Sequence, residues 1–216
     1  METSYSFLMG RDYEVLDILI PLHSDSPNPR ILDCTHNTGK MWKKSLYSPT
    51  KTIDIDPKYK TDLICDFRNM PILDGSFDIL IFDPPHLPTN AASKNSSKIY
   101  MDGYWITNDK GVGRDGDNVS DLFPPFLKEA KRVLVKNGIV LAKIADMVHN
   151  HKYQWQHVDF INASQEIGLT PCDAMIKSDP CAGNLKSSKW KNQKHLRKSH
   201  CYWLVIRNSS KCEKKD

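Results

Sequence analysis

The feature that most constrains this chain is a series of short apolar segments, each of strand length and each ending at an acidic residue. They lie at 30–33, 51–56, 62–66 and 76–83, with turn-forming or helical stretches between them. Strands that alternate with helices predict an α/β domain with a doubly wound, mostly parallel sheet. Ligands bind such sheets at the carboxyl ends of the strands, so we expect the acids to gather at one edge.

The rest of the chain continues the alternation. Apolar spacing predicts helices over 12–20, 40–46, 122–134 and 153–168 and strands over 139–144, 171–178 and 201–207, with a turn at 136–138. The 216 residues are 39% hydrophobic, which suits one core, so we expect one domain over 1–216.

One long stretch does not follow this pattern. Residues 86–118 are rich in Gly, Asn, Asp, Ser and Lys and show no sustained periodicity. Long irregular segments in compact domains are usually functional or mobile. We therefore interpret about 87–118 as an inserted substrate-recognition loop.

Basic residues are concentrated near the carboxyl end. The net charge is only +4, but no acid falls between the six basic residues of the segment 186–198. Such a segment could neutralise phosphates, and a solvated surface loop is the other interpretation. We predict a basic C-terminal segment over about 186–200.

Cysteine and histidine usage gives no sign of a metal centre. The six cysteines include no CxxC pair, and His149, His151 and His157 have no acid or cysteine that completes a ligand set. Neither a signal peptide nor an apolar run of membrane-spanning length is evident. We expect no metal, no membrane and a reducing cytoplasm.

The first acid opens a candidate cofactor loop, Asp33-Cys-Thr-His-Asn-Thr-Gly39. A strand that ends in an acid and turns tightly into a helix can cradle a nucleoside, although an ordinary strand-to-helix turn has the same pattern. Asn37 stands where another glycine is usual, and asparagine tolerates the left-handed conformation.

The next acids extend this interpretation. Asp54 follows about 20 residues later, where a carboxylate accepts hydrogen bonds from ribose, with Asp56 as the competing choice. Asp66 would accept from an adenine amino group, and Phe67 would flank the ring. The candidate cofactor-binding residues are Asp33, Thr35, Asn37, Gly39, Asp54, Asp66 and Phe67.

The sharpest motif is Asp83-Pro84-Pro85-His86, directly after the fourth strand. Two prolines stop the strand and stiffen the turn. An aromatic amine is a poor nucleophile because its lone pair is delocalised into the ring. Acceptors on both amino hydrogens, here Asp83 and the Pro84 carbonyl, could localise that lone pair, and His86 could stack on the base.

Together these motifs resemble the amino-methyltransferases that modify adenine N6 or cytosine N4 in DNA. The closing segment 194–206 is similar to that of short phage and bacterial members, and the likeness covers about 30–207. It implies a class I, Rossmann-like, seven-stranded sheet with helices on both faces and an antiparallel last strand. It also implies bound S-adenosylmethionine and a flipped base.

The chain departs from this family in two positions and one segment. Asn37 replaces a usual glycine, and His86 replaces a larger aromatic residue, which predicts weaker or pH-sensitive stacking. The long target-recognition domain of many members is absent, so the loop 87–118 would do that work. The candidate substrate-binding residues are Lys94, Tyr100, Trp105, Arg114, Lys194, His195, Arg197 and Lys198.

The resemblance implies a DNA methyltransferase, with adenine N6 favoured over cytosine N4, in the cytoplasm of a bacterial or phage-infected cell. A restriction enzyme could accompany it. An RNA or protein-glutamine methyltransferase with the same motif is an alternative. A non-catalytic partner subunit that binds nucleic acid is another, and it predicts no cofactor binding.

Overall fold

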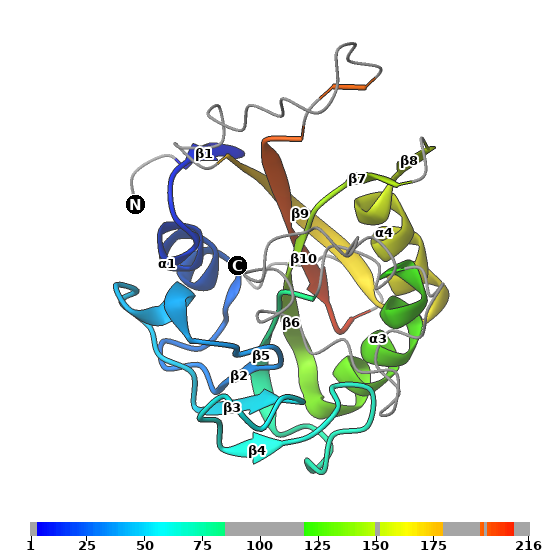
Figure 1. The fold of residues 1–216 in the computed structure, drawn as a ribbon. Coiled ribbons are helices and arrows are strands. Elements are labelled where there is room, and N and C mark those ends of the chain that lie inside the picture. Colours follow the sequence, from blue (N-terminus) through cyan, green and yellow to red (C-terminus); the bar gives the residue numbers. More distant parts are fainter. Residues whose placement is uncertain (1–3, 85–118, 150–151, 179–194, 197, 210–216) are drawn as a thin grey trace.

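The computed structural model describes residues 4–84, 119–149, 152–178, 195–196 and 198–209. Their centre is an eight-stranded sheet of order β1-β9-β10-β6-β5-β2-β3-β4 (Figure 1). All neighbouring strands are parallel except β10, which is antiparallel to both β9 and β6. The predicted mostly parallel sheet with an antiparallel last strand is confirmed.

Most strand bounds follow the predicted segments, although β6 begins at Leu134 instead of the predicted 139. The main sheet consists of β1 (Phe7–Met9), β2 (Ile31–Asp33), β3 (Lys51–Asp54), β4 (Leu63–Ile64), β5 (Phe77–Phe82), β6 (Leu134–Ile144), β9 (Thr170–Ser178) and β10 (His200–Arg207). A separate hairpin pairs β7 (Met147–His149) with β8 (Lys152–Gln154).

Helices cover both faces of the sheet (Figure 1). On one face, α1 (Asp12–His23) packs Val15 and Leu16 in one buried cluster with Ile31, Ile79 and Trp203 of the sheet. On the other face lie α3 (Phe123–Val133), preceded by the short helix η3 (Val119–Leu122), and α4 (Gln156–Glu166).

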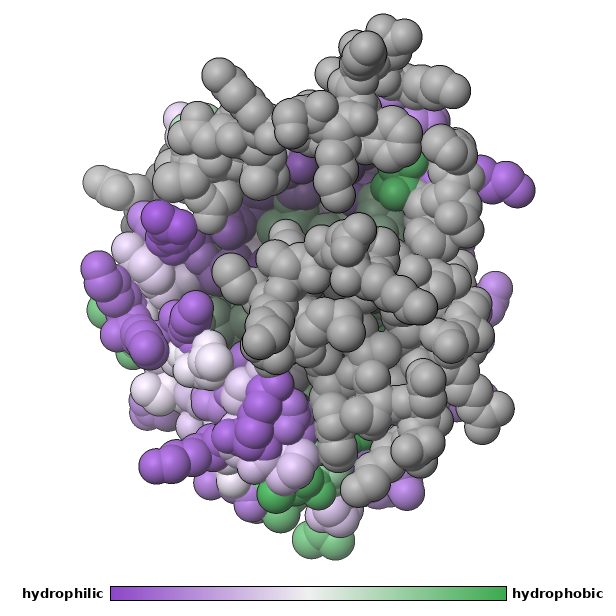
Figure 2. Space-filling model, in the orientation of Figure 1, coloured by the Kyte–Doolittle hydropathy of each residue, from purple (hydrophilic) through white to green (hydrophobic). Residues whose placement is uncertain are grey.

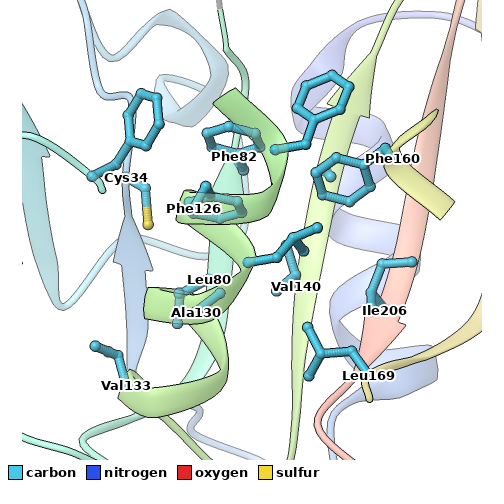
Figure 3. Close-up of a cluster of buried hydrophobic side chains, with 14 of the residues drawn as sticks. Cys34, Leu80, Phe82, Phe126, Ala130, Val133, Val140, Phe160, Leu169 and Ile206 are labelled. Carbon is cyan, nitrogen blue, oxygen red and sulfur yellow. The ribbon is translucent and has the colours of Figure 1, made fainter. Parts of the chain in front are cut away.

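Aromatic rings fill the core beneath α3 and α4. The rings of Phe82 and Phe126 are stacked with centroids 3.6 Å apart (Figure 3). Phe67 meets both rings edge-on. Phe82 and Phe126 have no exposed surface. Burial of such rings stabilises the fold by a few kcal/mol each, and it anchors the end of β5, where Asp83 follows.

Four sequence predictions need correction. The sheet has an eighth strand, β1, at its edge. The helix expected over 40–46 is only a 3₁₀ helix, η1 (Lys40–Trp42). The turn at 136–138 lies within β6, where the irregular residue Asn137 has φ 66°. The helix expected from 153 begins at Gln156, because 152–154 form β8.

The surface on the α1 and β2–β4 side is mainly hydrophilic in the view of Figure 2. In the described part of the chain, no helix combines the length and apolar character needed to cross a membrane. Cys34, Cys65 and Cys201 have free thiols, whereas Cys172 on β9 is in a disulfide, which the expectation of reduced cysteines did not include.

Candidate active site

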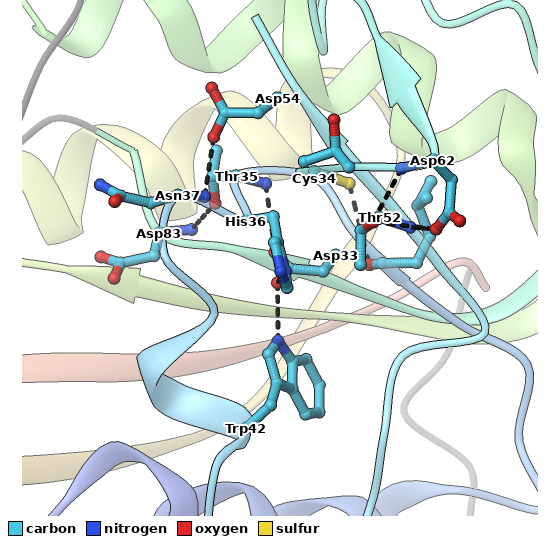
Figure 4. Close-up of polar contacts among 12 residues, drawn as sticks. Asp33, Cys34, Thr35, His36, Asn37, Trp42, Thr52, Asp54, Asp62 and Asp83 are labelled. Atoms are coloured by element: carbon cyan, nitrogen blue, oxygen red, sulfur yellow. Dashed lines mark hydrogen bonds and ion pairs between the residues drawn. The ribbon is translucent and has the colours of Figure 1, made fainter. Parts of the chain in front are cut away.

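The loop after β2 is organised around the buried carboxylate of Asp33. Its Oδ2 accepts hydrogen bonds from Trp42 Nε1 at 2.6 Å and lies 2.8 Å from His36 Nδ1 (Figure 4). Its Oδ1 accepts from the Thr35 N–H at 3.2 Å. Asp33 has no exposed surface, so it holds the loop in shape rather than facing a ligand.

The hydrogen bond to Asp33 has an electrostatic consequence for His36. This bond raises the pKa of His36 above its usual value, and partial burial opposes the rise without cancelling it. The imidazolium form is therefore favoured inside the loop, next to a carboxylate that it helps to neutralise.

Two residues of this loop adopt the left-handed conformation. Asn37 has φ 51° and Gly39 has φ 64°, so the conformation expected for Asn37 is confirmed. A Cβ on Gly39 would lie 2.8 Å from the His36 ring. Glycine is therefore required there for its backbone angle and for the close approach of the imidazole.

Asp54 connects the end of β3 to the same loop. Its Oδ2 accepts from the Asn37 N–H at 2.8 Å and its Oδ1 from the Asp56 N–H at 2.9 Å. Burial raises the pKa of Asp54 despite these hydrogen bonds. The competing choice, Asp56, is 6% exposed and pairs with Lys58 at 2.8 Å.

The third acid is held by a neighbouring cation. Asp66 forms a forked pair with Arg68, with Nη2 to Oδ2 at 2.6 Å and Nε to Oδ1 at 3.0 Å. An adenine amino group would share this carboxylate with the guanidinium. Phe67 is 6% exposed and packs in the aromatic core, so little of its side chain could meet a ligand.

Asp83, after β5, is tied to the candidate cofactor loop. Its N–H donates to Thr35 Oγ1 at 2.8 Å (Figure 4). Pro84 is buried, whereas Pro85 and His86 lie outside the described residues. The structure therefore brings the start of the Asp-Pro-Pro-His motif against the loop that carries Asn37 and Gly39.

Lys143 on β6 is a further charged residue of this site, and none of the sequence motifs described above contains it. Its Nζ lies 3.1 Å from Asp83 Oδ2 and 2.9 Å from Asp12 Oδ2, and its side chain is 16% exposed. Burial alone would lower the pKa of Lys143, but the carboxylates of Asp83 and Asp12 more than offset this effect and raise it. Lys177 holds the other oxygen of Asp12 at 3.0 Å.

Few of the predicted substrate contacts can be placed. His195 is exposed, and Lys198 Nζ lies over the ring of Tyr153, 3.9 Å from its centroid. The remaining six residues fall outside the described ranges: Lys94, Tyr100, Trp105, Arg114, Lys194 and Arg197. The recognition loop predicted at about 87–118 lies outside them as well.

Taken together, the carboxyl edge of β2, β3 and β5 presents a glycine-containing loop, the partly buried carboxylate of Asp54 and the fixed carboxylate of Asp83. Such an edge can hold a nucleoside and, beside it, an amine that donates hydrogen bonds to Asp83.

Comparison with known proteins supports the fold. No family profile and no curated protein matches the sequence. Solved structures do match. A proposed sarcosine dimethylglycine methyltransferase from Galdieria sulphuraria aligns with TM-score 0.55 and 12% identity over 92% of this chain and 85% of its own. A methyltransferase from Leishmania major aligns with TM-score 0.51 and 12% identity over 90% of this chain and 72% of its own.

The fold is that of a class I methyltransferase. At these identities the likeness concerns the fold alone. A proposed DNA modification methylase from Thermus thermophilus also matches, with TM-score 0.42 and 14% identity over 68% of this chain. This chain spans about half, 52%, of that protein's length. Within the class I methyltransferase fold, β10 is the antiparallel strand that the sequence resemblance implied.

Proposed function

We propose that this protein is an S-adenosylmethionine-dependent methyltransferase that acts on an exocyclic amino group of a base in DNA, with adenine N6 favoured over cytosine N4. The observation that carries the proposal is the contact between the two motifs, the Asp83 N–H on Thr35 Oγ1 at 2.8 Å. This contact supports the idea that Asp83, as the acceptor for the amine, has a fixed position beside the candidate cofactor loop of a class I methyltransferase fold.

The residues present fit the cofactor. The left-handed backbone at Asn37 and Gly39 allows close approach of a ligand to the loop, and Asp54 offers a carboxylate at the end of β3 for ribose hydroxyls. Thr35 shapes the loop, while Asp33 would contribute indirectly from its buried position. Bound S-adenosylmethionine supplies an electrophilic methyl group, and no protein nucleophile is needed.

Asp83 would act on the amine. A carboxylate has two oxygens with about four lone-pair positions, so contact with Lys143 leaves it able to accept a further hydrogen bond. With the Pro84 carbonyl as the second acceptor, both amino hydrogens are held and the nitrogen lone pair is directed out of the ring. Catalysis then comes from positioning and electrostatics.

Lys143 suits this role for Asp83. Its positive charge attracts the ionised carboxylate and therefore disfavours protonation of Asp83. This matters because a protonated acid would lose acceptor capacity. The second carboxylate, Asp12, balances the charge of Lys143, so the group beside the amine is not a bare cation.

The nucleic-acid substrate is supported by the basic segment 186–200, of which Lys198 is placed at the same edge of the sheet, beside Tyr153. His86 would stack on the flipped base, and Pro85 would stiffen the turn before it. The preference for adenine rests on aspartate as the first residue of the motif. RNA is the alternative substrate.

The test is methyl transfer from labelled S-adenosylmethionine to unmethylated duplex DNA and, separately, to RNA, followed by mass spectrometry of the nucleosides. We expect label in N6-methyladenine of DNA. Label in N4-methylcytosine would correct the base, and label in RNA alone would correct the substrate. A chain that binds no cofactor would be the non-catalytic partner subunit, and the proposal would be abandoned.

A further inference from the structure

A group of aromatic side chains lies at the same edge of the sheet as Asp83, outside the site described above. We define the aromatic patch as Tyr153, Trp155, His157 and Tyr202. Trp155 is 57% exposed, although tryptophan is usually well covered in a folded domain. The ring centroids of Trp155 and Tyr153 are 4.2 Å apart, and His157 stacks on Tyr202 at 4.1 Å.

A buried carboxylate fixes two of these rings. Asp146, 4% exposed, accepts from Tyr153 Oη at 2.9 Å, and its Oδ1 lies 2.7 Å from His157 Nδ1. It also accepts from the His157 N–H at 3.2 Å. The rings are therefore held in place before any partner binds, which reduces the ordering cost of an interaction.

Strand register places the patch close to the candidate active site. Phe82 pairs with Ala142, and Ile144 pairs with Tyr202, so Tyr202 lies two strands from the residues that follow β5. Neighbouring strands are about 4.8 Å apart, which puts Tyr202 roughly 10 Å along the edge. Tyr202 packs on the α3 and α4 face, whereas Asp83 pairs with Lys143, which also binds Asp12 of α1. A chain that enters the site with one base would have adjacent bases within reach of the patch.

Two lysines of the described residues accompany the rings. Lys198 lies over the Tyr153 ring at 3.9 Å, and Lys152 on β8 is exposed. In the sequence Lys194 and Arg197 precede Lys198, and both lie outside the described residues. Flat rings with basic side chains around them are what proteins use to bind unpaired bases, the rings by stacking and the cations by contact with phosphates.

We propose that the aromatic patch, with Trp155 as its exposed ring, is a stacking surface for an unpaired base of the nucleic-acid substrate next to the target base. This inference rests on the proposed nucleic-acid substrate. It adds a second contact, which would offset part of the cost of taking the target base out of its helix.

The experiment measures binding of the full chain to a fluorescent single-stranded DNA of about 20 nucleotides, by anisotropy at several salt concentrations. Trp155→Ala should weaken binding on the order of 5- to 150-fold, as loss of one stacked base predicts. Trp155→Phe should restore part of the loss. Trp155 makes no side-chain hydrogen bond as the N-cap residue of α4, so its replacement removes no cap.

The matched control is Leu73→Ala, which truncates an apolar side chain that is 82% exposed and lies before β5, away from the carboxyl edge. It should leave affinity unchanged. The ratio between wild type and Trp155→Ala should stay constant with salt, whereas Lys198→Gln should reduce the salt dependence itself.

Equal affinity of Trp155→Ala and wild type for the oligonucleotide would overturn the inference. So would an equal loss in Leu73→Ala. If methylation that depends on Asp83 continues while Trp155→Ala binds normally, the stacking surface fails and the proposed function survives. If Trp155→Ala loses binding but no methyl transfer to any nucleic acid occurs, the patch stands and the proposed chemistry fails.

Discussion

The ammonium of Lys143 lies 3.1 Å from Oδ2 of Asp83, across neighbouring strands β6 and β5. The carboxylate proposed to hold the amine is therefore itself held from a rigid element, not from a loop. Lys143 in turn is fixed by Asp12 at the start of α1, so the first turn of α1 contributes to the geometry of the site.

Replacement of Lys143 should affect both stability and activity. Lys143→Met removes the cation that Asp83 and Asp12 share in a mostly buried setting, and removal of one member of such a group costs about 3–5 kcal/mol. Because the nearby positive charge is lost, Asp83 should protonate more easily, and the acid limb of the activity profile should move to higher pH. Lys143→Arg should restore part of both properties.

Urea unfolding and the pH dependence of kcat measure these effects separately. Lys128→Met, which changes an exposed lysine on α3, is the control and should change neither. A Lys143→Met protein with the stability and pH profile of wild type would contradict the positioning role.

Gly39→Ala should damage the cofactor loop. The new Cβ would lie 2.8 Å from the His36 ring at a residue with φ 64°, so the backbone and the imidazole both have to shift. We expect a loss of about 1–2 kcal/mol of stability and clearly weaker binding of S-adenosylmethionine by calorimetry. Gly75→Ala is the matched control, since Gly75 has φ 61° but a Cβ added there would meet no atom within 4 Å. An equal loss of affinity in both variants would show that the contact with His36 is irrelevant.

His36 should make the stability of the loop depend on pH. Its pKa is raised in the folded protein, mainly by the hydrogen bond to Asp33. The stabilisation is therefore complete below the unfolded pKa of about 6.5 and is lost as pH rises through the higher folded pKa. Urea unfolding from pH 5 to 9 should show that the difference in free energy of unfolding between wild type and His36→Gln becomes smaller as pH rises. A difference that grows with rising pH would contradict a stabilising interaction between protonated His36 and Asp33.

Asp54 predicts a different pH effect, on binding. An ionised carboxylate accepts hydrogen bonds from ribose hydroxyls, and burial raises the pKa of Asp54. Affinity for S-adenosylmethionine should therefore begin to fall on acidification at a higher pH than an ordinary aspartate would cause. Asp54→Asn should bind more weakly at neutral pH and lose this acid dependence. Asp74→Asn, at a carboxylate that is 78% exposed, should change neither the affinity at neutral pH nor its dependence on acidification.

Much of the architecture could be predicted from the sequence because the strands are apolar and their ends carry acids and turn residues. Phe77–Phe82 is an example. It is an almost continuous apolar run, as in a buried parallel strand, and it stops at Asp83. β1 was missed because its three residues are mostly exposed and carry almost no pattern. The helix expected after Gly39 shortens to one turn, where Trp42 Nε1 donates to Asp33.

The partners of charged residues were less predictable. Asp12 and Lys143 are 131 positions apart, and no local pattern joins them. Phe67 was expected beside an adenine ring, but the local sequence gave no sign of the rings of Phe82 and Phe126 that enclose it. The aromatic patch was missed for the same reason, since its rings come from β8, the start of α4 and β10.

The central claim is tested most directly by methyl transfer to unmethylated DNA by wild type and by Asp83→Ala, with cofactor affinity measured in parallel. The account predicts that Asp83→Ala binds S-adenosylmethionine as wild type does and transfers the methyl group at least about 100-fold more slowly. Transfer by Asp83→Ala at the wild-type rate would contradict it, because the amine would then be oriented by something other than this carboxylate.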